Sequence, residues 1–140
     1  MNIVQYLGVL VLSICLSSLC VHAEDRPEQS AQRAAETWLG HVDAVEYATS
    51  WKEASPYFQG RVTEAAWAVA LQGVRTPLGT VLSRHLKSAQ YTTSVPGAPD
   101  GHYVVMQFNT RLEHKQAAME TITFLQKQDG TWKAAGYYIK

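Results

Sequence analysis

Residues 101–140 alternate between apolar and polar side chains, and this period of two predicts three antiparallel strands. The last two strands meet at Asp129-Gly130, a pair that favours a two-residue hairpin turn because both turn positions adopt positive φ. A turn of this length fixes the register of the hairpin. The register contains these pairs: Phe124–Ala135, Ile122–Tyr137 and Glu120–Ile139. The opposite face of the hairpin then carries a largely apolar set: Leu125, Trp132, Gly136 and Tyr138.

Before these strands, apolar residues recur at spacings of three and four and predict three helices. The first helix begins near Pro27. Asp43, with Glu46 three residues later, matches an N-cap and its capping-box partner and predicts the start of a second helix, which ends before Pro56. A third helix begins at Thr63-Glu64 and is stopped by Pro77. The expected inward residues of the second and third helices are Val45, Ala48, Trp51, Ala66, Trp67, Ala70, Leu71 and Val74.

Residues 80–95 fit either a short helix or a strand, and we favour a strand because the sheet otherwise has only three. The order of elements is then three helices followed by about four antiparallel strands. This order predicts one α+β domain over residues 24–140, with the helices packed on one face of a curved antiparallel sheet. A small pocket between helices and sheet is the default site in such an arrangement.

Residues 1–23 have the pattern of a cleaved signal peptide. Leu7–Leu19 is an apolar run, shorter than the span of about 20 residues that crosses a membrane, and Val21-His22-Ala23 fits a cleavage site. We therefore expect an exported protein, periplasmic or secreted, that meets the membrane only through the signal peptide before cleavage. Both cysteines lie in this segment, so residues 24–140 contain neither a disulfide nor a thiol nucleophile.

The chain carries 12 basic and 12 acidic residues, all of them after residue 23, and its formal net charge is zero. A neutral domain without a basic stripe is a poor match for nucleic acid, so we expect no nucleic-acid partner. The four histidines after residue 23 lack the spacing of metal ligands, and no phosphate-binding loop or nucleophile motif occurs. The sequence therefore predicts no metal site and no cofactor.

Several short segments resemble a bacterial family of domains of unknown function, numbered four thousand and nineteen. The resemblance rests on Arg75-Thr76-Pro77-Leu78-Gly79 with Ser83-Arg84, on 96–101 and 103–108, and on Asp129-Gly130-x-Trp132 with Ala135-Gly136-Tyr137. It runs from about Ala35 to the C-terminus. The resemblance implies a small exported protein with a cystatin-like or nuclear-transport-factor-two-like fold. It implies no particular activity, and a fold of this kind does not choose one.

Four polar residues interrupt or border apolar faces and form the candidate ligand-binding site: Arg75, Arg84, Glu120 and Tyr137. One interpretation is structural, because a buried Glu120 needs a cationic partner and Arg84 or Arg75 can supply it. The second is a pocket for an anion, since guanidinium groups bind carboxylates bidentately. A third makes Glu120 the acid or base of an isomerase-like or hydrolase-like enzyme, beside His85 or Tyr137.

Together these patterns predict a non-catalytic module that binds a small ligand or another protein, and the pocket enzyme is the alternative. The expected partners are an unidentified small ligand or an envelope protein. The apolar face of the hairpin, with Trp132 and Tyr138, also predicts a homodimer formed through the sheet.

Overall fold

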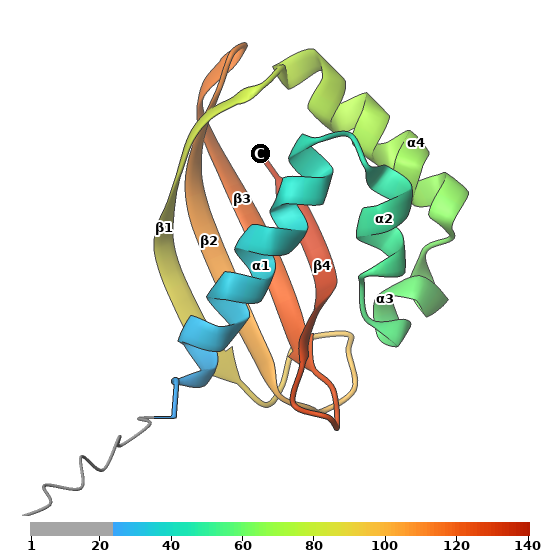
Figure 1. The fold of residues 1–140 in the computed structure, drawn as a ribbon, viewed down its shortest axis with the longest axis vertical. Coiled ribbons are helices and arrows are strands. Elements are labelled where there is room, and N and C mark those ends of the chain that lie inside the picture. Colours follow the sequence, from blue (N-terminus) through green and yellow to red (C-terminus); the bar gives the residue numbers. More distant parts are fainter. Residues whose placement is uncertain (1–23) are drawn as a thin grey trace, which may run out of the picture.

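The computed structural model describes residues 24–140, so the predicted signal peptide lies outside the described residues (Figure 1). The helices are α1 (Pro27–Asp43), α2 (Tyr47–Lys52), α3 (Pro56–Arg61), α4 (Glu64–Arg75) and the 3-10 turn η1 (Thr76–Leu78). The strands are β1 (Val81–Thr92), β2 (Tyr103–Leu112), β3 (Lys115–Gln126) and β4 (Trp132–Ile139). The predicted α+β class is confirmed, as is the strand between residues 80 and 95. Within residues 24–140, no helix has the length and apolar character needed to cross a membrane.

The four strands form one antiparallel sheet in the order β1-β2-β3-β4. Helix α1 lies across the sheet in contact with every strand, while α2, α3 and α4 lie beside β4 (Figure 1). The core lies between α1 and the alternate residues of β2 and β3 that face this helix. Their apolar side chains are removed from water on folding, which stabilises the fold. Its fully buried members include Ala35, Leu39, Val104, Met106, Phe108, Ile122 and Phe124.

The hairpin of β3 and β4 differs from the prediction near its turn. The loop is Gln128–Gly130, one residue longer than predicted, with Gly130 at φ 86° and a 2.8 Å hydrogen bond from Lys127 N to Thr131 O. A glycine in the left-handed region suits this longer loop as well as the two-residue turn. The strand positions next to the loop therefore pair one residue out of the expected register: Gln126–Trp132, Leu125–Lys133 and Phe124–Ala134.

A β-bulge at Ala135 then restores the predicted register, because it places one extra residue in β4. The predicted pairs Ile122–Tyr137 and Glu120–Ile139 are confirmed, and Phe124–Ala135 is wrong. The bulge also turns Trp132 to the helix side of the sheet, where it is 7% exposed. Trp132 is therefore not on the open face with Tyr138, which remains 60% exposed.

Two of the three predicted helix starts are confirmed and one is wrong. Helix α1 begins at Pro27, as predicted. Thr63 caps α4, and its side chain accepts a hydrogen bond from Ala66 N. Asp43 does not begin a helix: α1 continues to Asp43, and the next helix starts at Tyr47 with no side-chain cap. The helix α3, capped by Ser55, was not predicted.

Five residues that were expected to face inward on the second and third helices are exposed, so this part of the prediction is wrong: Val45, Ala48, Ala66, Ala70 and Val74. Val45 lies in the turn between α1 and α2, at φ 63°, and is 65% exposed rather than inward. Val74 is 45% exposed, because α4 instead buries Arg75 at the end of its inward stripe. At the end of α4, the buried Arg75 side chain forms an ion pair with Asp43 at 2.8 Å.

Candidate functional site

The four predicted site residues do come together in space, along with two residues that the sequence did not single out. Six side chains, called the charged cluster below, meet between the ends of α1 and α4 and the four strands. They are Asp43 (α1), Arg75 (α4), Arg84 (β1), Thr110 (β2), Glu120 (β3) and Tyr137 (β4).

Arg84 is the central cation of the charged cluster and contacts both carboxylates. Its Nε donates to Glu120 Oε1 at 2.7 Å. Its Nη1 and Nη2 donate to the two oxygens of Asp43 at 2.7 and 3.0 Å. The side chain is 14% exposed, and these charged partners raise the pKa of Arg84 despite the opposing effect of burial. Its Nη2 also donates to Glu120 Oε2 at 3.3 Å, so the guanidinium bonds both oxygens of each carboxylate.

Glu120 is completely buried and fully supplied with donors. Besides Arg84, Thr110 Oγ1 donates to Glu120 Oε1 at 2.6 Å, and the Tyr137 hydroxyl donates to Glu120 Oε2 at 2.7 Å. Burial, followed by the negative charge of Glu120, raises the pKa of Tyr137. Tyr137 therefore stays a neutral donor over the physiological range, which is the form the carboxylate requires.

Arg75 completes the arrangement from the end of α4. Its Nη2 donates to Asp43 Oδ1 at 2.8 Å, and its Nη1 donates to the Tyr137 oxygen at 3.3 Å. Burial alone raises the pKa of Asp43, but hydrogen bonds from Arg84 and Arg75 outweigh it and hold that pKa below its ordinary value. Two guanidinium groups thus face two carboxylates, and the charged cluster is neutral as a whole.

The structural interpretation of Glu120 matches these distances, since it pairs directly with Arg84. A ligand-binding role for Arg75, Arg84, Glu120 and Tyr137 stays a prediction. His85, expected as a possible neighbour of Glu120, pairs instead with Asn109 across the strands and is exposed, whereas the neighbouring Arg84 turns to the helix side.

Thr110 and Asp43 belong to the charged cluster but were not predicted as site residues, for different reasons. Thr110 is a polar residue between Phe108 and Leu112 on an otherwise apolar face of β2, and that interruption could have identified it. Asp43 was assigned to another role, because its spacing to Glu46 fits a helix cap and its capping-box partner. Glu46 instead accepts a hydrogen bond at Oε2 from the His41 ring, whose Nδ1 lies 2.7 Å away.

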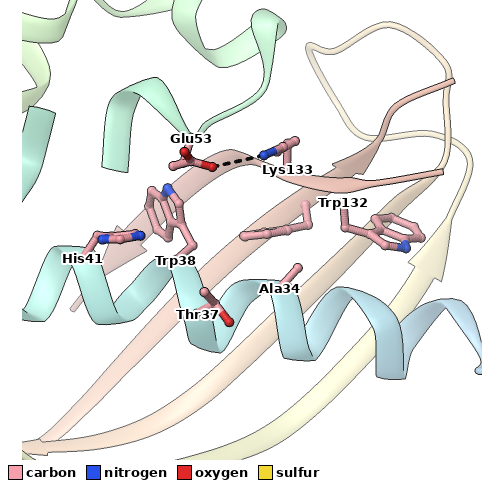
Figure 2. Close-up of a pocket in the computed structure, with 8 residues that line it drawn as sticks. Ala34, Thr37, Trp38, His41, Glu53, Trp132 and Lys133 are labelled. Carbon is pink, nitrogen blue, oxygen red and sulfur yellow. Dashed lines mark hydrogen bonds and ion pairs between the residues drawn. The ribbon is translucent and has the colours of Figure 1, made fainter. Parts of the chain in front are cut away.

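A separate cavity, called the α1–β4 pocket below, lies between helices and sheet, where a pocket was predicted (Figure 2). Its volume is about 200 Å³. Helix α1 contributes four lining residues, the sheet three, and the segment after α2 one. They are Ala34, Thr37, Trp38 and His41, then Phe124, Trp132 and Lys133, and finally Glu53.

The walls of the α1–β4 pocket are held in place by other parts of the fold. Trp38 donates from Nε1 to Ser50 O at 2.8 Å, and its ring lies against those of Trp67 and Phe124 at 6.0 and 6.1 Å between centroids. At the rim, Lys133 Nζ lies 3.2 Å from Glu53 Oε2, as the dashed line in Figure 2 marks. The sequence predicted a pocket between helices and sheet but not the residues that line it, because tryptophans at helical spacing are usually core residues.

Metal binding has no support in the part of the chain that the structure describes. Within residues 24–140, no three His, Cys, Asp or Glu side chains are grouped so that they could hold a metal ion.

The fold and its cavities define a small α+β domain with an open antiparallel sheet, a neutral charged cluster at one end and an aromatic pocket under α1. The sequence matches the family described as "Protein of unknown function (DUF4019)" over residues 34–137, and the chain belongs to this family. The family resemblance of the sequence is thereby confirmed. A search among curated proteins finds none that matches.

Proposed function

We propose that this protein is an exported, non-catalytic binding module, and that its small-ligand site is the α1–β4 pocket. The observation that carries the proposal is the pocket itself: a cavity of about 200 Å³ whose lining includes Trp38, Phe124 and Trp132. Concave sites lined by aromatic side chains, with a few polar groups at the rim, are typical of small-molecule binding. Thr37 and the Glu53–Lys133 pair supply such polar groups here.

The charged cluster is a weaker candidate for the ligand site. Its two cations already face two anions, and Glu120 has no exposed surface. An anionic ligand would have to displace Asp43 or Glu120 from the arginines, which leaves a buried charge without a partner. The cluster is better explained as the feature that fixes α1 and α4 to the sheet.

The alternative, a pocket enzyme with Glu120 as acid or base, has less support. A general acid or base must reach the substrate within hydrogen-bond distance, directly or through one water. Both oxygens of Glu120 are occupied by Arg84, Thr110 and Tyr137, and the carboxylate is buried. A substrate would reach it only after this arrangement had opened.

The proposal is tested by filling the pocket. Ala34 is half-buried on its wall, so Ala34→Phe places a ring inside the cavity without removing any core side chain. A matched control is Ala65→Phe, because Ala65 is exposed on α4 and outside the pocket. A library of small ring compounds is screened by ligand-detected NMR. We expect compounds that bind the unmodified protein and the control but not Ala34→Phe; equal binding to all three, or to none, contradicts the proposal.

Export and assembly are tested on the full chain, produced in a bacterial host and weighed by native mass spectrometry. We expect a protein that begins at Glu24 in the periplasmic or secreted fraction; an uncleaved chain in the cytoplasm contradicts export. A homodimer through the sheet is also part of the proposal. The support for this dimer is Tyr138, which is exposed on the open face of the sheet. Trp132 lies on the helix side and does not contribute to that face.

A further inference from the structure

A groove, called the α4–β4 groove below, lies between β4 and the helices α3 and α4, which stand beside that strand (Figure 1). It consists of two cavities of about 580 and 160 Å³. Both cavities are lined by Trp67, Ala70 and Tyr137, so they adjoin. The groove shares no lining residue with the α1–β4 pocket and is therefore a separate feature of the surface.

The α4 wall of the groove is an exposed apolar stripe. Ala66, Ala70 and Val74 follow one another at intervals of four residues, which places them on one face of the helix, and all three are exposed. The sequence pattern predicts that these residues face inward, but the fold leaves them uncovered. Among the lining residues of the groove only Arg61 is charged, and it donates to Gly97 O at 3.0 Å. The lining therefore complements apolar side chains.

The β4 wall of the groove offers unpaired backbone groups. Lys140 at the end of β4 exchanges two backbone hydrogen bonds with Met119 of β3, at 2.9 and 3.1 Å. In an antiparallel ladder, residue pairs of this kind alternate with pairs whose N–H and C=O groups point away from the partner strand. Tyr137 and Ile139 therefore direct their backbone groups to the outer edge of β4. Within residues 24–140, these groups have no hydrogen-bond partner.

The same edge of β4 is already paired with main chain at its other end. Ser55 N, just before α3, donates to Ala134 O at 2.8 Å. No such contact covers the edge from Ala135 to Ile139 in the described part of the chain. An unpaired edge is a template for an added strand. Peptides that bind in this way gain affinity from main-chain hydrogen bonds and specificity from alternate side chains in neighbouring pockets.

From the unpaired edge and the apolar wall together, we infer that the α4–β4 groove binds an extended, apolar peptide segment of a partner protein. The segment adds to the four-stranded sheet next to β4. Its N–H and C=O groups pair with those of Tyr137 and Ile139, and its alternate side chains lie against the exposed stripe of α4. Proline at a pairing position would remove one of these hydrogen bonds. The inference goes beyond the small-ligand site and does not depend on it.

The test uses peptides of about ten residues, the length of a long strand, selected from a random phage-displayed library. The target is the protein purified after expression of the full chain. Ala70→Lys places a charge where the two cavities adjoin, and Ala65→Lys makes the same change on an exposed part of α4 outside the groove. We expect the affinity of the selected peptides, measured by fluorescence anisotropy, to fall about tenfold or more in Ala70→Lys and to stay unchanged in Ala65→Lys.

Two measurements distinguish strand addition from contact with side chains alone. Single N-methylation along a selected peptide should weaken binding at alternate positions, because only alternate N–H groups of an added strand face β4. Hydrogen exchange followed by NMR should be fast at the Tyr137 and Ile139 amides of the free protein and slower when the peptide is bound. The Tyr138 amide, which faces β3, should exchange slowly in both states.

The inference is overturned if no peptide is selected, if Ala70→Lys and Ala65→Lys affect binding equally, or if the losses on N-methylation do not alternate. It is also overturned if the Tyr137 and Ile139 amides already exchange slowly in the free protein. A dimer in light scattering would then identify a second copy as the occupant of the edge. None of these outcomes bears on the α1–β4 pocket, which is tested separately with Ala34→Phe.

Discussion

Replacing Glu120 by glutamine tests whether the charged cluster stabilises the fold. The change keeps the shape of the side chain but removes its negative charge, leaving Arg84 and Arg75 with Asp43 as the remaining carboxylate. The new amide nitrogen also takes the place of an oxygen that accepts from either Thr110 or Tyr137. Glu120 is fully buried, so water cannot compensate for these losses.

Breaking a buried ion pair from one side costs roughly 3–5 kcal/mol, and we expect about 3 kcal/mol because Arg84 retains Asp43. This is a large part of the 5–15 kcal/mol by which a typical domain is stable. For a domain of this size the loss corresponds to a fall in the melting temperature of roughly 10 °C.

The assay is urea denaturation at pH 7, followed by tryptophan fluorescence, with Glu36→Gln as the control. Glu36 is exposed on α1, so the same chemical change there should alter the free energy of unfolding by less than about 0.5 kcal/mol. A loss of less than about 1 kcal/mol in Glu120→Gln would refute the structural reasoning. Unchanged stability would instead favour the alternative in which Glu120 is a catalytic acid or base.

Three further results are expected. The ion pairs hold the pKa of Asp43 in the folded protein below the ordinary value of an aspartate, so Asp43 stabilises the fold above that ordinary value and less so as pH falls through the folded pKa. The free energy of unfolding should therefore fall less steeply in acid for Asp43→Asn, and an unchanged pH dependence would contradict this. Val45→Gly should raise the free energy of unfolding by about 1 kcal/mol, since Val45 is mostly exposed and holds a left-handed conformation unfavourable for a β-branched residue; a loss of stability in denaturation would contradict this. If the protein is a dimer through the sheet, Tyr138→Asp should yield monomers in light scattering, and a dimer that survives the change would disprove that interface.

The architecture was predictable because strands alternate with a period of two and the helices carry regular apolar stripes. The register next to the turn was not, because Asp129-Gly130 is compatible with loops of two lengths. The longer loop and the bulge at Ala135 offset each other, so the pairing of Ile122 with Tyr137 is the same in both cases. Beyond the bulge, the pairing is therefore the same as for a two-residue turn without a bulge, and the sequence pattern cannot distinguish the two arrangements.

The charged cluster was predictable where a polar residue interrupts an apolar face, as Arg84 and Glu120 do. Asp43 was assigned wrongly because a local rule for helix caps and a distant ion pair compete for the same carboxylate. In the folded chain the ion pair prevails, with two arginines donating to Asp43. The lining of the α1–β4 pocket was not predicted, since it depends on the bulge that turns Trp132 toward α1.

The charged cluster has a consequence for how the chain folds. Its side chains come from α1, α4 and each of the four strands, so no part of the chain forms it alone. A partly folded form that buried Glu120 before Arg84 or Tyr137 had arrived would hold an unpaired charge or acceptor out of water. Such intermediates are penalised relative to both the unfolded and the native chain. We therefore expect folding to be a single cooperative transition, in which α1 and β4 pack onto the rest of the fold in the same step.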